Sequence, residues 1–66
     1  MGKKYKFIYF VKQEDDVYNC CNNRSDDVLG QVRWYPMWKQ YCYYPKEDTV
    51  YNVTCLNDIN DFIGSL

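Results

Sequence analysis

Two short runs near the start of the chain are rich in aromatic and β-branched residues, and this composition predicts β-strands whose successive side chains point to opposite faces. The runs span residues 5–12 and 17–21, and the polar stretch between them predicts a hairpin turn. On the first strand the odd positions are expected to face the core: Tyr5, Phe7, Tyr9 and Val11.

That orientation leaves Ile8 and Phe10 on the outer face of the first strand, bracketed by Lys6 and Lys12. An exposed apolar pair needs cover, and a single helix on the opposite face does not supply it. The sequence therefore predicts a homodimer with Ile8 and Phe10 in its interface. The alternative is that a long loop of the same chain covers both side chains.

Two more strands are predicted at residues 28–35 and 38–44, after a polar loop. Pro36 cannot occupy a two-residue hairpin position that needs positive φ, so a proline-led type I or II turn or a wider loop is expected. Gly30 is interpreted as a bulge or as close packing beside a large aromatic residue such as Tyr43.

If Tyr35 lies opposite Trp38, alternation divides this hairpin into two faces. The more apolar face is expected to point inward and holds Val32, Trp34, Lys39, Tyr41 and Tyr43. The outer face then holds Gln31, Arg33, Tyr35, Trp38, Gln40, Cys42 and Tyr44. This division makes Trp34 a core residue and Trp38 a candidate binding residue.

The C-terminal segment has a helical period of apolar residues. Asn52 or Thr54 is expected to cap a helix that runs to about Ile63. Its apolar stripe consists of Cys55, Leu56, Ile59, Phe62, Ile63 and Leu66. The predicted fold is α+β, a small antiparallel sheet of about four strands with one C-terminal amphipathic helix packed on one face, in a single domain over residues 1–66.

Charge is arranged in blocks along the chain. The formal net charge is −1 and the pI is about 5.1, which argues against a general polyanion binder. Residues 1–12 carry four lysines and no acid, 13–30 carry five acids against one arginine, 31–46 carry three cations, and 47–66 carry four acids. Either these blocks pair across neighbouring strands, or two basic strands lie together and form a local positive patch.

The cysteine pattern favours a reducing compartment. The first residues do not resemble a secretory signal, so the four cysteines are expected to be reduced and the protein cytoplasmic. A cystine between Cys42 and Cys55 is the pairing expected if that prediction is wrong. There is no histidine and no CxxC spacing, so neither a metal site nor a cofactor is predicted.

Catalytic signals are weak throughout. The chain has no histidine for proton transfer near neutral pH and no glycine-rich phosphate loop among its three glycines. The acid pairs at 15–16 and 26–27 lie in polar loops, where solvated carboxylates are the ordinary interpretation. We expect a non-enzymatic protein.

One long pattern begins at Leu29. It reads Leu29-Gly30-x-Val32-x-Trp34-Tyr35-Pro36-x-Trp38-Lys39-Gln40-Tyr41-x-Tyr43-x-Pro45, then Thr49-Val50-Tyr51 and Cys55-Leu56-x-Asp58-Ile59-x-x-Phe62. This pattern resembles a family of short phage and prokaryotic proteins to which no activity is assigned. The resemblance covers the C-terminal half of the chain. It implies a phage or prokaryotic intracellular setting and carries no functional residue onto this sequence.

The candidate binding residues surround Pro36 and are Arg33, Tyr35, Trp38, Lys39 and Gln40. A cation pairs with an anionic group, aromatic rings stack, and an amide forms hydrogen bonds. Such a surface suits a small sequestering or inhibitory protein, with an accessory or anti-defence role, that holds a nucleotide-like small molecule or a host protein. The alternative is a single-stranded nucleic-acid module in which Lys6, Lys12, Arg33 and Lys39 follow the backbone.

Overall fold

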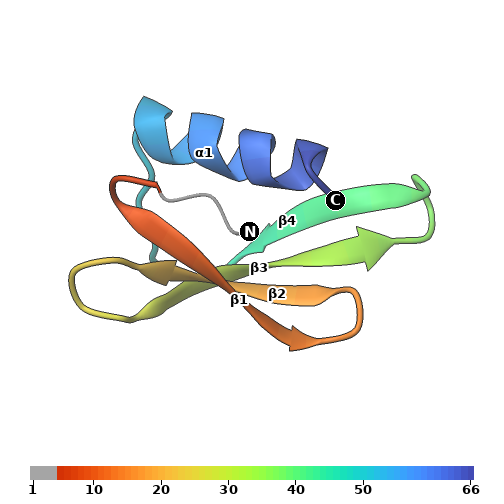
Figure 1. Cartoon of the computed structure of the whole chain (residues 1–66), viewed down its shortest axis with the longest axis horizontal. Helices are drawn as coiled ribbons and strands as arrows, with labels where there is room; N and C mark the ends of the chain where they lie inside the picture. The colour runs from red at the N-terminus through yellow and green to blue at the C-terminus, as the bar shows by residue number, and fades with distance from the viewer. Residues whose placement is uncertain (1–4) are drawn as a thin grey trace.

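The computed structural model describes residues 5–66, which form a four-stranded antiparallel sheet and a helix (Figure 1). The elements are β1 (Ile8–Glu14), β2 (Val17–Asn22), β3 (Val28–Tyr35), β4 (Gln40–Pro45) and α1 (Val53–Gly64). The strands follow one another in the order β1-β2-β3-β4, and α1 lies across one face of the sheet. The predicted α+β fold is confirmed. Lys3 and Lys4, half of the predicted N-terminal basic block, lie outside the described residues.

The core lies between the sheet and α1. Its centre is built from Ile8, Cys20, Cys55 and Ile59, and Val32 is also fully buried. Phe10 stacks on Phe62 of the helix, with 3.9 Å between ring centroids and nearly parallel planes. The helical stripe is confirmed at Cys55, Ile59, Phe62 and Ile63, whereas Leu56 and Leu66 are exposed and Leu66 lies beyond the end of α1.

The predicted orientation of the first strand is wrong. Ile8 is only 1% exposed within a single chain, and Phe10 packs against the helix. The even positions of β1 therefore face α1, and Tyr9 and Val11 lie on the open face. The homodimer interface predicted from Ile8 and Phe10 loses its basis, because the helix of the same chain already covers both side chains.

The β3–β4 hairpin turns through a four-residue loop, the wider of the expected connections. Tyr35 pairs with Gln40, and two backbone hydrogen bonds of 3.2 Å, from Trp38 N to Tyr35 O and from Lys39 N to Pro36 O, close the loop. Lys39 completes it with a positive φ of 50°. The pairing differs from the predicted register by two residues, so every side chain keeps its predicted face.

Gly30 marks both a bulge and a close contact, as predicted. The β2–β3 ladder shifts where Cys20 pairs with Gly30 and Cys21 with Val28. A Cβ placed on Gly30 would lie 2.5 Å from the hydroxyl oxygen of Tyr43. Tyr43 thus occupies the space that any other residue at position 30 would fill.

A tyrosine pair fixes the segment that leads into α1. The Tyr51 hydroxyl donates to the Leu29 carbonyl at 2.7 Å, so it accepts from Tyr43, whose hydroxyl lies 2.7 Å away. Burial and this hydrogen bond raise the pKa of Tyr43 well above its ordinary value. Asn52 then caps the helix, with its side-chain oxygen accepting from Cys55 N at 2.8 Å.

All four cysteines are free thiols in the structure. Cys42 lies on the open face of the sheet, whereas Cys55 belongs to α1 under the other face, so the two cannot pair without rebuilding the sheet. Burial raises the pKa of Cys20 to about 11, which keeps that thiol protonated at neutral pH. Within residues 5–66, no helix has the length and apolar character needed to cross a membrane.

Candidate functional site

The open face of β3 and β4 carries a cluster of aromatic side chains around Arg33. The Arg33 guanidinium carbon lies 4.0 Å from the ring centroid of Tyr44, a close cation–π contact. The two residues come from adjacent strands, and alternation directs both away from α1. The contact orders two long side chains on a surface that the helix does not cover.

Tyr35 joins this pair to the hairpin loop. Its ring lies 5.0 Å from that of Trp38 and 6.4 Å from that of Tyr44, edge to face in both cases. Arg33, Tyr35, Trp38 and Tyr44 are called the aromatic patch below. The three aromatic members of the patch, with Cys42 and Tyr43, line a shallow depression of about 300 Å³.

The patch ends at a projecting loop. Met37 is 80% exposed and Trp38 is 66% exposed, and they are neighbours at the tip of the β3–β4 hairpin. Ring contacts fix one edge of Trp38 while most of its surface stays open to solvent. An ordered and accessible indole ring is a typical anchor for a binding partner.

Three of the five predicted binding residues lie in this patch. Gln40 pairs with Tyr35 on the neighbouring strand. That pairing keeps Gln40 on the open face, but Gln40 and Lys39 both border another depression, of about 290 Å³, which Trp34 and the end of α1 also line. Lys39 is thus separate from Arg33, and the predicted site divides between the two sides of the loop.

Trp34 has the predicted orientation but not the predicted burial. It packs edge to face against Tyr41 at 5.3 Å and lines an open depression at the end of α1, and its side chain is 45% exposed. The expectation of a fully buried core tryptophan is wrong. Truncation of Trp34 should therefore cost less than the about 3 to 5 kcal/mol typical of a core aromatic residue.

Tyr44 is the patch residue that the sequence-based selection missed. Strand alternation had already placed it on the outer face with Arg33, so the signal was present. Its importance depends on the register, because only with Gln31 opposite Tyr44 does its ring lie diagonally beside Arg33. The register of β3 against β4 follows from the four-residue length of the loop between them.

A row of amide side chains crosses the open face beside the patch. Gln31 Nε2 donates to Asn19 Oδ1, and Asn19 Nδ2 donates to Gln13 Oε1, each at 2.9 Å. These amides form a ladder from β3 to the edge of β1. On this side the aromatic patch has a polar border, as at the rim of many protein interfaces.

The tyrosines near acids are poor candidates for acid–base chemistry. Hydrogen bonds to Asp26 and Asp16 raise the pKa values of Tyr9 and Tyr41 to about 12. Both hydroxyls therefore stay protonated near neutral pH. Among residues 5–66, no group of three or more histidine, cysteine, aspartate or glutamate residues is placed to hold a metal ion.

The chain was compared with protein-family models, with curated proteins and with solved structures, and none of the three comparisons gives a match. The resemblance to short phage and prokaryotic proteins therefore stays a prediction.

Proposed function

We propose that this protein is a non-enzymatic binding protein that attaches to another protein through the aromatic patch. The observation that carries the proposal is the ordered Arg33–Tyr44–Tyr35–Trp38 cluster, which presents a largely exposed tryptophan. Tryptophan, tyrosine and arginine dominate the binding energy of protein interfaces. Their mutual contacts reduce the side-chain entropy that binding would otherwise remove.

The shape of the site favours a protein over a nucleotide-like small molecule. Small-molecule sites enclose most of their ligand in cavities of about 300 to 1,000 Å³. The depression in the patch has a volume of about 300 Å³, at the lower limit of that range, and Trp38 on its border projects into solvent. A convex hairpin tip inserts into a partner more readily than it surrounds a ligand.

The positions of the cations weigh against the single-stranded nucleic-acid alternative. Lys12 lies opposite Tyr18 of the neighbouring strand, on the helix side of the sheet, whereas Arg33 lies on the open face. Lys6 precedes β1 at the end of the sheet opposite Lys39. These side chains do not follow one track along which a phosphate backbone could run.

We extend the proposal to the setting of the protein. An accessory or anti-defence role in a prokaryotic host, exercised in the cytoplasm, is supported by the resemblance of residues 29–62 and by the free thiols. Inhibition of a host protein is an activity that the exposed Trp38 anchor could provide in a domain of this size.

Matched affinity columns test this function. Wild type, Trp38→Ala, Arg33→Ala and Val50→Ala would be immobilised and exposed to the same prokaryotic lysate. Val50 is an exposed apolar residue outside the patch, so its variant controls for nonspecific hydrophobic retention. The expected result is a protein retained by wild type and Val50→Ala but lost from the two patch variants.

The retained protein, once purified, should bind Trp38→Ala at least about tenfold more weakly than wild type. Equal retention on all four columns would reject the patch as the binding surface. Filter binding to oligonucleotides tests the alternative, since salt-steep binding would favour nucleic acid and no binding at about 50 mM salt would eliminate it.

A further inference from the structure

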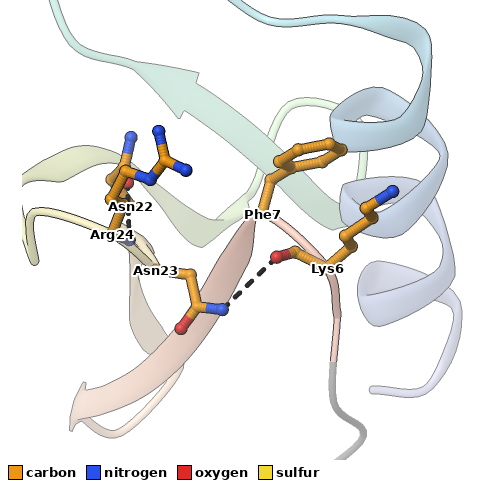
Figure 2. A pocket seen from close by; sticks show the side chains of 5 residues that line it. All are labelled: Lys6, Phe7, Asn22, Asn23 and Arg24. Carbon is orange, nitrogen blue, oxygen red and sulfur yellow. Dashed lines mark hydrogen bonds between the residues drawn. The ribbon is translucent and has the colours of Figure 1, made fainter.

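A second cavity lies at the other end of the sheet, away from the aromatic patch. Its volume is about 530 Å³, and its walls are the entry to β1 and the start of the β2–β3 loop. Figure 2 shows its lining residues, which are Lys6, Phe7, Asn22, Asn23 and Arg24. The strand order places this cavity opposite the β3–β4 hairpin, so the two sites share no residue.

Backbone hydrogen bonds hold the two walls together. Asn23 N donates to Phe7 O at 2.8 Å, and Asn23 Nδ2 donates to Lys6 O at 3.3 Å (Figure 2). Asn22 Oδ1 accepts from Arg24 N at 2.8 Å, which fixes the turn that carries the arginine. The backbone walls of the cavity are therefore fixed by the fold.

The lining is cationic in a protein whose overall charge is −1. Lys6 and Arg24 line the cavity and no carboxylate does. Among residues 5–66, neither cation has an ion-pair partner, whereas Lys12 is paired with Asp15. Two unneutralised cations at one cavity favour an anionic ligand.

The other lining groups indicate the chemical class of the ligand that carries the anionic group. Phe7 is 38% exposed, and in the view of Figure 2 its ring lies between the Lys6 ammonium and the Arg24 guanidinium. Lys6 Nζ lies 5.4 Å from the centroid of that ring. An accessible ring beside a cation can stack on a planar heterocycle.

We propose that this cavity binds a mononucleotide. Lys6 and Arg24 would contact the phosphate, and the Phe7 ring would stack on the base. Asn22 Nδ2 and Asn23 Oδ1, the amide atoms not used in the hydrogen bonds above, would bind the sugar or the base edge. The cavity volume falls within the range of small-molecule sites. This site is independent of the proposed partner-binding function, because it uses none of the patch residues.

The test is a titration followed by amide chemical shifts, with adenosine 5′-monophosphate as the probe. The expected result is saturable shifts at residues 6–7 and 22–24, with adenosine and inorganic phosphate each binding at least about tenfold more weakly. Lys6→Gln and Arg24→Gln should each weaken binding about tenfold, because each removes one charge-assisted contact. Both residues are exposed, so these variants should keep the dispersed spectrum of the folded protein.

Lys12→Gln is the matched control, since it removes the same charge at the far end of β1 and should leave affinity unchanged. Equal weakening by Lys12→Gln would show a general charge effect and overturn the site. Absence of saturable shifts at millimolar probe would overturn it as well. If a thymidine hexanucleotide bound more than tenfold more tightly than the mononucleotide, the cavity would be reassigned to a nucleic-acid chain. A negative result in any of these titrations would not affect the lysate experiment, which tests the aromatic patch.

Discussion

Replacement of Gly30 by alanine tests the packing that holds the hairpin against the core. The new Cβ would meet Tyr43 Oη at 2.5 Å, Tyr43 Cζ at 2.7 Å and the backbone oxygen of Tyr44 at 2.6 Å. Cβ atoms in folded proteins do not approach other atoms this closely. Gly30 does not have a positive φ, so space and not backbone conformation requires glycine here.

Two routes of relaxation set the cost of Gly30→Ala. If Tyr43 stays in place, overpacking of a filled site costs about 1 to 3 kcal/mol. If its ring swings out, the chain loses a hydrogen bond to Tyr51 worth about 1 kcal/mol and ring burial worth about 1.5 to 3 kcal/mol. The Tyr44 oxygen belongs to the β3–β4 ladder and cannot move aside, so we expect a loss of about 2 to 4 kcal/mol.

Such a loss is a large fraction of the stability of this chain, which at 66 residues should be about 3 to 10 kcal/mol. Urea unfolding followed by circular dichroism gives the free energy by linear extrapolation. Gly64→Ala is the matched control, because nothing lies within 4 Å of its added Cβ and alanine favours the helix. If Gly30→Ala lost less than about 1 kcal/mol, or no more than Gly64→Ala, the packing argument would fail.

Three further predictions concern the core, the tyrosines and the thiols. Phe10→Ala should lower the free energy of unfolding in urea by about 3 kcal/mol, because it removes the ring stacked on Phe62. Trp38→Ala should change that free energy by less than about 1 kcal/mol, because Trp38 is largely exposed. The reverse order would refute the assigned faces. Folding raises the pKa values of Tyr5, Tyr9 and Tyr41 from 10.0 to about 12. The folded state therefore favours the protonated hydroxyls, and this stabilisation is complete below pH 10 and is lost as the pH rises through 12. Urea melts across that window should show the fall, and Tyr41→Phe should flatten part of it; a curve that is unchanged by the variant would contradict the hydrogen bond to Asp16. Thiol titration under denaturing, non-reducing conditions should count four free groups, and a count of two would contradict the structure.

The two strands of the second hairpin could be oriented from sequence because their two faces differ in character. One face of β3 has Val32 and Trp34, and the other has Gln31 and Arg33. Loop length was the unknown, and a loop longer by two residues changes the partners but not the faces. The aromatic patch was therefore accessible from the sequence, except for the diagonal contact between Arg33 and Tyr44.

The orientation of β1 could not be derived in the same way, because both of its faces are apolar. Tyr9 and Val11 balance Ile8 and Phe10, so alternation alone does not choose between them. The choice is made by a partner far along the chain, since Phe62 of α1 stacks on Phe10. Tyr9 is accommodated on the open face because its hydroxyl donates to Asp26 at 2.8 Å.

The cationic cavity depends on an equally long-range arrangement, because it pairs residues 6–7 with residues 22–24. Antiparallel pairing of β1 with β2 joins these segments, since Ile8 is the partner of Asn22. No local motif contains both cations, and Arg24 is the single base in the acidic block 13–30, so the charge blocks do not indicate this cavity. The blocks left pairing across strands and a local positive patch as alternatives, and neither Lys6 nor Arg24 has an ion-pair partner among residues 5–66.

Strand order explains how one small sheet can carry two sites of different chemistry. In a meander the β1–β2 turn and the β3–β4 hairpin lie at the same end, which the hydrogen bond from Tyr41 to Asp16 demonstrates. That end combines the carboxylates of residues 14–16 with the aromatic patch. The opposite end receives the entry to β1 and the β2–β3 loop, and with them Lys6 and Arg24. Because the two ends are separated by the length of the strands, a mononucleotide in the cavity would leave the patch free, and both ligands can be bound by the same molecule.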